Sequence, residues 1–167
     1  MKKKKRIICF VLIIGTLLTF SGCAKSKPSI DSPVKFYYPI AQSQYSVLHE
    51  AIQFEIREGT VYSGNLERLL NEYLLGPVSA ELENPFPASC SVVSLSQTNQ
   101  HIDLTLSTQF ARLIGIDLII ACACISSTIF GLSNCNTVRF SVNNFLLDGN
   151  QEIIIHRDDI LTTHLPI

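Results

Sequence analysis

The most constraining feature of this sequence is a change of hydrophobic period between residues 66 and 106. Apolar residues first recur at the three- and four-residue spacing that forms one stripe along an α-helix. This stripe consists of Leu66, Leu69, Leu70, Tyr73 and Leu74. Further along, Ile102, Leu104 and Leu106 alternate with polar residues, as in a β-strand with one buried face. The region therefore predicts an amphipathic helix followed by strands.

The end of the first helix and the turn of the hairpin are marked by their residue types. Gly76 supplies the backbone freedom that a helix C-terminus needs, and Pro77 cannot extend a helix. Residues 77–88 are rich in proline and glutamate, so we expect an ordered but irregular loop there. A strand at residues 93–95 and a turn at Thr98-Asn99 complete the predicted hairpin.

Alternating patterns also mark strands at residues 34–38, 52–57 and 137–142, and Ile153 with Ile155 suggests a last one. The predicted fold is α+β, an antiparallel β-sheet with two helices packed on one face. Polar residues fill the positions of these strands that we expect to point outward, leaving a possible partner-binding face. The residues proposed for it are Glu55, Arg57, Asp103 and Arg139.

Residues 113–132 form a twenty-residue apolar segment with one charge, Asp117, and allow two interpretations. A membrane-spanning helix is one, because the length and hydropathy are sufficient. A buried core helix is the other, since small and partly polar residues such as Cys124 and Thr128 share one stripe while aliphatic residues form a second. The surrounding strands favour the core helix.

The N-terminal segment resembles a bacterial lipoprotein signal. A basic run at residues 2–6 precedes an apolar run at residues 7–20, and Ser21-Gly22 lead into Cys23. The resemblance implies that residues 1–22 are removed and that Cys23 is lipidated, with an uncleaved membrane anchor as the alternative. We expect a tether at 23–33, one domain at 34–160 and a tail at 161–167.

Removing residues 1–22 leaves eight basic and fourteen acidic residues, a net charge of −6. An acidic domain without a basic patch argues against nucleic-acid binding. Four cysteines remain besides Cys23, and we expect them to act as buried free thiols; a Cys90–Cys135 bridge is the alternative. No spacing of cysteine or histidine indicates zinc, and no motif indicates a cofactor or a catalytic nucleophile.

Several segments together resemble the GerMN domain family. They are Val34-Lys35-Phe36-Tyr37-Tyr38, Tyr73-Leu74-Leu75-Gly76-Pro77, Glu81 with Pro85 and Pro87, the hairpin, the long helix through Thr128, and Val138-Arg139-Phe140. The resemblance covers nearly all of residues 34–148. It implies an extracytoplasmic, often lipid-anchored protein of spore-forming Gram-positive bacteria or actinobacteria, with a fold like the ring-building module of secretion-type channels. No family member is known as an enzyme.

We therefore predict a non-enzymatic interaction module, tethered by lipid on Cys23 to the outer face of a Gram-positive cell membrane. It would serve an envelope, sporulation or germination assembly through protein partners or a homo-oligomer, with no cofactor and no metal. An accessory lipoprotein of a sensor kinase, or a small-ligand-binding lipoprotein, is the alternative.

Overall fold

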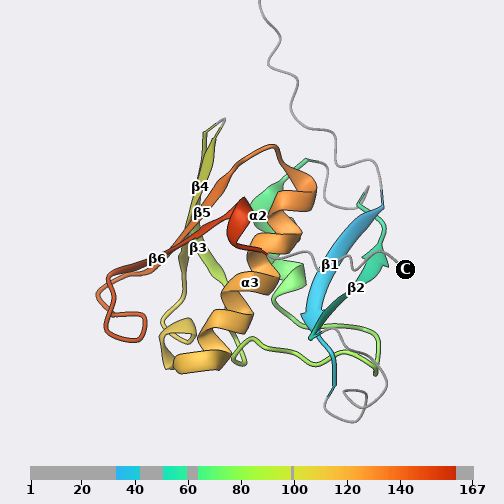
Figure 1. Ribbon diagram of the computed structural model, residues 1–167, viewed down its shortest axis with the longest axis horizontal. Coiled ribbons are helices and arrows are strands. Elements are labelled where there is room, and N and C mark those ends of the chain that lie inside the picture. Colours follow the sequence, from blue (N-terminus) through green and yellow to red (C-terminus); the bar gives the residue numbers. More distant parts are fainter. Residues whose placement is uncertain (1–32, 42–50, 60–63, 99, 161–167) are drawn as a thin grey trace, which may run out of the picture.

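A computed structural model of the chain describes residues 33–41, 51–59, 64–98 and 100–160 (Figure 1). The elements are β1 (Val34–Pro39), β2 (Ile52–Arg57), α2 (Leu66–Tyr73), β3 (Val92–Gln97), β4 (His101–Leu106), η3 (Phe110–Arg112), α3 (Gly115–Leu132), β5 (Thr137–Val142), β6 (Glu152–His156) and η4 (Arg157–Asp159). The predicted signal segment 1–22, Cys23 and the tail 161–167 lie outside the described residues.

The predicted α+β class, with two α-helices among the described residues, is confirmed. The strands do not form one antiparallel sheet, however. β1 and β2 form a two-stranded antiparallel sheet, and the others form a four-stranded sheet in the order β3-β4-β5-β6. β4 and β5 are parallel neighbours, since α3 connects them and returns the chain to the starting end of the sheet. Strand alternation alone does not specify either arrangement.

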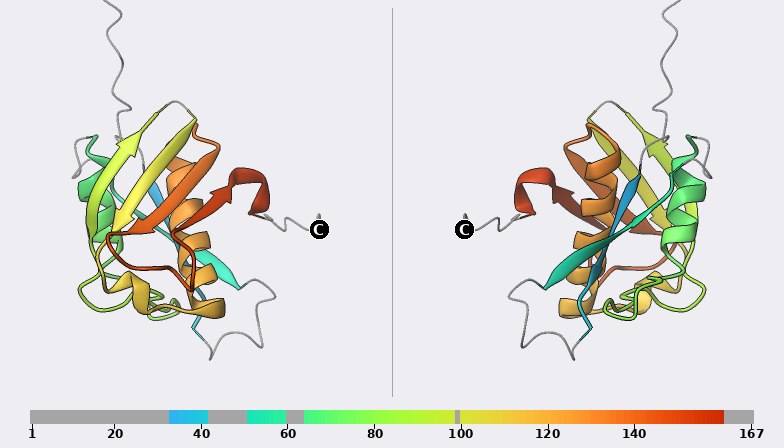
Figure 2. Two further views of the ribbon diagram at one scale, coloured as in Figure 1. Left: turned by 90° about the vertical axis from the view of Figure 1, so that its left-hand side faces the viewer. Right: turned by 90° about the vertical axis from the view of Figure 1, so that its right-hand side faces the viewer.

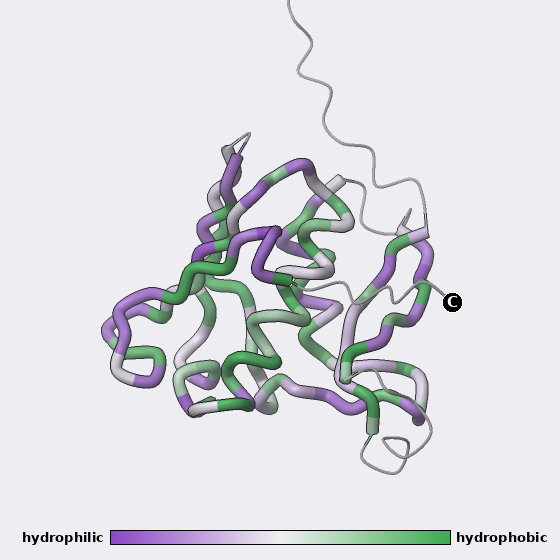
Figure 3. The backbone as a smooth tube through the Cα atoms, viewed as in Figure 1, coloured by the Kyte–Doolittle hydropathy of each residue, from purple (hydrophilic) through white to green (hydrophobic). Residues whose placement is uncertain are grey.

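α3 lies between the two sheets, and the two α-helices lie on one side of the four-stranded sheet (Figure 1). The apolar stretch along this helix runs through the interior (Figure 3). α3 is long and apolar enough to cross a membrane, with a mean hydropathy of 1.9, but half of it is buried inside the fold. The packing is that of the predicted core helix.

The stripe on α2 is buried as predicted, and it meets an aromatic cluster beneath β1. Tyr73 stacks on Phe36 with ring centroids 5.2 Å apart, and Phe86 from the proline-rich loop approaches Tyr73 edge-on at 5.0 Å. Asn65 caps the start of the helix through its side chain. After the helix, Gly76 adopts φ +105°, the conformation for which a glycine was expected.

The outer edge of β1 is closed by side chains and by the loop after α2. The amide of Tyr37 donates to Thr128 Oγ1 at 3.1 Å, and its carbonyl accepts from the Tyr73 hydroxyl. Two residues further along β1, the carbonyl of Pro39 accepts from the amide of Glu83 at 2.9 Å. The small sheet is thereby attached to α3, to α2 and to the ordered loop.

Candidate functional site

The four-stranded sheet has one face packed on the helices and one face without a helix in front of it (Figure 2, left). Alternation along the strands creates this difference. Leu104 and Phe140 are buried on the inner face, whereas their neighbours Asp103 and Arg139 point the other way. We call the uncovered side the open face. Its central residues are Ser94, Ser96, Asp103, Thr105, Arg139, Ser141, Glu152 and Ile154.

Short hydroxyl side chains form one row across the open face. The strand register places Ser94 beside Thr105, and Thr105 beside Ser141. The hydroxyl oxygens of Thr105 and Ser141 are 3.2 Å apart, within hydrogen-bond distance. Because these side chains are short, this part of the face is flat and polar.

The neighbouring row carries Asp103 and Arg139, and the third charge, Glu152, lies at the end of the hydroxyl row beside Ser141. Arg139 Nε lies 3.5 Å from Asp103 Oδ1 and 3.5 Å from Glu152 Oε2, and all three side chains are nearly half exposed. Exposed ion pairs of this kind contribute only about 0–1 kcal/mol to stability. Asp103 Oδ1 is a buried acceptor that has no hydrogen-bond partner among the described residues. The three charges are therefore weakly committed to the fold and remain available to another molecule.

Glu55 and Arg57 do not belong to the open face, and the prediction that the four residues share one surface is wrong. Both lie on β2 in the smaller sheet, and their side chains are mostly buried. Arg57 donates to Glu55 and to the carbonyl of Gly76 at 2.7 Å each, while Glu55 accepts from the amides of Val78 and Ser79. The pair holds the turn that follows α2.

The error concerns which side of β2 faces inward. Register pairs Phe36 with Glu55, so the polar side of β2 shares a face with the buried side of β1. The apolar residues Phe54 and Ile56 are the exposed ones. Strand alternation shows that β2 has two different faces but not which one is buried. Here the polar face is turned inward, because Glu55 and Arg57 bind the backbone of residues 76–79.

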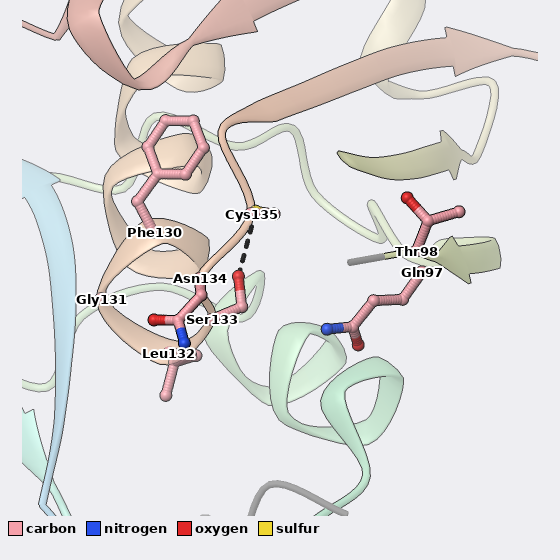
Figure 4. Close-up of a pocket in the computed structure, with 8 residues that line it drawn as sticks. All are labelled: Gln97, Thr98, Phe130, Gly131, Leu132, Ser133, Asn134 and Cys135. Atoms are coloured by element: carbon pink, nitrogen blue, oxygen red, sulfur yellow. Dashed lines mark hydrogen bonds between the residues drawn. The ribbon is translucent and has the colours of Figure 1, made fainter. Parts of the chain in front are cut away.

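An open depression of about 420 Å³ lies where the end of α3 meets the β3–β4 hairpin (Figure 4). Its lining residues are Gln97, Thr98, Phe130, Gly131, Leu132, Ser133, Asn134 and Cys135. None of them is an aspartate, glutamate, histidine, lysine or arginine, and the Ser133 hydroxyl donates to Cys135 Sγ at 3.0 Å. The lining offers hydrogen bonds but no acid–base pair.

The four described cysteines are free and buried, as expected. Burial raises the pKa of the Cys90 thiol to about 11 and that of Cys122 to about 12, so both remain protonated at neutral pH. A protonated, buried thiol is a poor nucleophile and a poor metal ligand. Within the described ranges, no group of three or more histidine, cysteine or acidic residues could hold a metal ion.

The fold and the open face define an α+β domain whose four-stranded sheet presents a polar surface. Its structure is similar to the tandem GerMN domains of the sporulation protein GerM from Bacillus subtilis, with a TM-score of 0.52 and 15% identity. The similarity covers 80% of this chain but 47% of that one, so this chain spans about half the length of the GerM structure. The expected GerMN resemblance is thus confirmed for the fold alone.

A second structural similarity is weaker. A Clostridium perfringens protein described as a "Putative Lipoprotein" matches with a TM-score of 0.42 and 14% identity, over 77% of this chain and 89% of that one. No protein-family model and no curated protein matches the sequence.

Proposed function

We propose that this chain is a non-enzymatic interaction module, held outside the cell by a lipid on Cys23, whose open face binds a protein partner in an envelope, sporulation or germination assembly. The observation that carries the proposal is the uncovered polar sheet face around Asp103, Arg139 and Glu152. The GerM-like fold supports the choice of assembly, and the signal-like N-terminus supports the location.

The composition of the open face fits a polar protein–protein contact. Specific interfaces that form between separately folded proteins are about as polar as the rest of the surface, and charges fix their register. A partner that places a cationic or amide N–H donor beside the exposed part of the Asp103 carboxylate would add to the ion pair that this group forms with Arg139. The flat hydroxyl row would allow a partner backbone or side chain to approach closely.

The described cysteines and the depression at the end of α3 give little support to an enzyme. Each described thiol is buried, and the lining of the depression contains no aspartate, glutamate, histidine, lysine or arginine. General acid–base catalysis needs a titratable group within hydrogen-bond reach of the reacting atom. The lining combines hydrogen-bonding groups with the apolar side chains of Phe130 and Leu132, so binding is the role that its chemistry favours.

The partner face is tested by site-specific photocrosslinking in growing and sporulating cells. A crosslinker placed at Ser141 on the open face should capture a protein, which is then purified for binding measurements. Arg139→Glu should weaken that binding about tenfold or more, because it converts the mixed charge cluster into three acidic groups. The matched control is Arg68→Glu, the same charge reversal at an exposed position of α2 on the helix-covered side.

Equal weakening by Arg139→Glu and Arg68→Glu would contradict a specific role for the open face. The absence of any adduct in every growth phase would do so as well. The lipid anchor has a separate test: Cys23→Ala should abolish incorporation of labelled fatty acid, and a variant that is still labelled would rule out Cys23 as the acylated residue.

A further inference from the structure

The two edges of the small β1–β2 sheet differ. β1 has its outer edge occupied by Thr128, the Tyr73 hydroxyl and the amide of Glu83. Among the described residues, β2 has no corresponding neighbour on its outer edge, and it lies at the outside of the molecule (Figure 2, right). This edge is remote in sequence and in sheet from the open face, so it is a separate surface.

The hydrogen bonds of Tyr37 fix which groups β2 presents on its outer edge. Residues in an antiparallel pair alternate between positions that exchange hydrogen bonds and positions that do not. Tyr37 directs its amide and carbonyl away from β2, so its register partner Phe54 must direct its own away from β1. The same follows for Ile52 and Ile56, two residues to either side.

The exposed side chains of β2 are apolar, which suits a strand that associates with another strand. Phe54 is 43% exposed and Ile56 62% exposed, and Tyr37 lies 5.6 Å from the Phe54 ring on the same face. Natural edge strands are usually protected by proline, lysine or a bulge. β2 contains no proline or lysine and pairs with β1 in an unbroken register. Its two charged residues, Glu55 and Arg57, are turned inward, where they bind each other and the backbone after α2 and leave the outer edge itself uncharged.

We propose that two copies of this chain associate through the outer edges of their β2 strands, in an antiparallel pairing centred on Phe54. The two small sheets then become one four-stranded sheet, which is more stable than an isolated pair of strands. A two-fold axis closes this contact, because the same edge is used by both copies. The product is a dimer and not a fibre.

The sequence of β2 is self-complementary in this register. Phe54 faces Phe54 of the second copy, Ile52 faces Ile56, and Gln53 faces Glu55, so no like charges are opposed. A shift of the centre by one residue would place Glu55 opposite Glu55 of the second copy. Like charges directly opposite each other destabilise a sheet, which disfavours the Glu55-centred pairing relative to the Phe54-centred one.

The test is sedimentation equilibrium of the full chain in detergent over a range of protein concentrations. Wild type should show a monomer–dimer equilibrium, and Ile56→Lys should weaken it by at least about tenfold. Ile119→Lys is the matched control, because Ile119 is 60% exposed but lies on α3, away from β2. It should dimerise like wild type. Wild type that stays monomeric at the highest attainable concentration, or an Ile56→Lys dimer of unchanged affinity, would overturn the proposal.

Amide hydrogen exchange locates the interface and guards against a variant that fails to fold. The amides of Ile52, Phe54 and Ile56 should be protected in the wild-type dimer and lose that protection on dilution. Protection that does not depend on concentration would mean that the chain covers this edge itself, which overturns the proposal. Arg139→Glu should dimerise like wild type; loss of the dimer in this variant would assign the contact to the open face instead.

Discussion

Arg157 donates two hydrogen bonds to the carbonyl oxygen of Cys135, from Nε at 3.1 Å and from a terminal nitrogen at 2.7 Å. The same guanidinium reaches the carbonyls of Phe130 and Ser133 and lies 4.6 Å from the Phe130 ring centre. The last carbonyls of a helix have no partner within the helix and form the negative end of its dipole. Arg157 therefore caps the C-terminal end of α3.

Replacing Arg157 should destabilise the fold through the loss of this cap. Arg157→Gln removes a planar group that satisfies three carbonyls, and we expect a loss of about 2–3 kcal/mol in the free energy of unfolding. Arg157→Lys should recover only part of it, since an ammonium group lacks the fork geometry. Urea unfolding measures both.

The exposed Arg112 provides the control for the cap. Arg112→Gln removes the same charge without removing a described hydrogen bond, so it should change the free energy of unfolding by less than about 0.5 kcal/mol. Equal effects at positions 112 and 157 would show that net charge, and not the cap, determines stability.

Thr128 connects α3 to the small sheet through one hydroxyl. Its Oγ1 accepts from the amide of Tyr37 at 3.1 Å and donates to the carbonyl of Cys124 at 3.0 Å. Thr128→Val keeps the shape but leaves the strand amide unpaired, so it should cost about 1–3 kcal/mol by urea unfolding. Thr105→Val, on the open face, should cost less than about 0.5 kcal/mol, because water can replace its hydrogen bond to Ser141. Equal costs would contradict the role of Thr128.

The elements of this fold were predictable, whereas their grouping was not. The spacing of apolar residues and the residue types at the ends of elements predicted α2, the hairpin and the helix of residues 115–132, because both signals are local in sequence. The division into two sheets depends on contacts such as Thr128 with Tyr37, which are 91 residues apart. No local pattern records which strands become neighbours.

The candidate site was predictable only in part, because local patterns do not record long-range contacts. Asp103 and Arg139 lie on strands whose apolar sides face the core, so alternation assigned them correctly to the open face. Arg57 and Arg157 instead point inward to cap the turn after α2 and the end of α3. Both reach backbone carbonyls, which sequence does not distinguish from one another.

The core assignments from the helical and strand patterns give a further prediction. Leu70 on α2 and Leu104 on β4 are each 1% exposed. Leu70→Ala or Leu104→Ala should each cost about 2–5 kcal/mol, because apolar contact is lost and a cavity remains. Val78→Ala, at an 84% exposed position, should be nearly neutral. A loss of less than about 0.5 kcal/mol at either leucine in urea unfolding would contradict its place in the core.

Stability should fall in alkaline solution because the buried thiols keep their protons in the folded state. Burial raises the pKa of Cys90 to about 11 and of Cys122 to about 12, above the ordinary value of 9.0. The unfolded chain therefore binds fewer protons above pH 9, and the free energy of unfolding decreases as pH rises from 9 toward 12. Burial also raises the pKa of Tyr38 and Tyr73, which adds to the decrease above pH 10.

Urea unfolding under reducing conditions at pH 7, 9 and 10 is compared between wild type and a double cysteine variant, because the tyrosines, with an ordinary pKa of 10.0, contribute equally to both proteins. Wild type should lose stability between pH 9 and pH 10. The double variant Cys90→Ala and Cys122→Ala should start from a lower stability but show a shallower decrease over that interval, since two of the titrating groups are gone. The same slope in both proteins would mean that these thiols titrate alike in the folded and unfolded states, contrary to their burial.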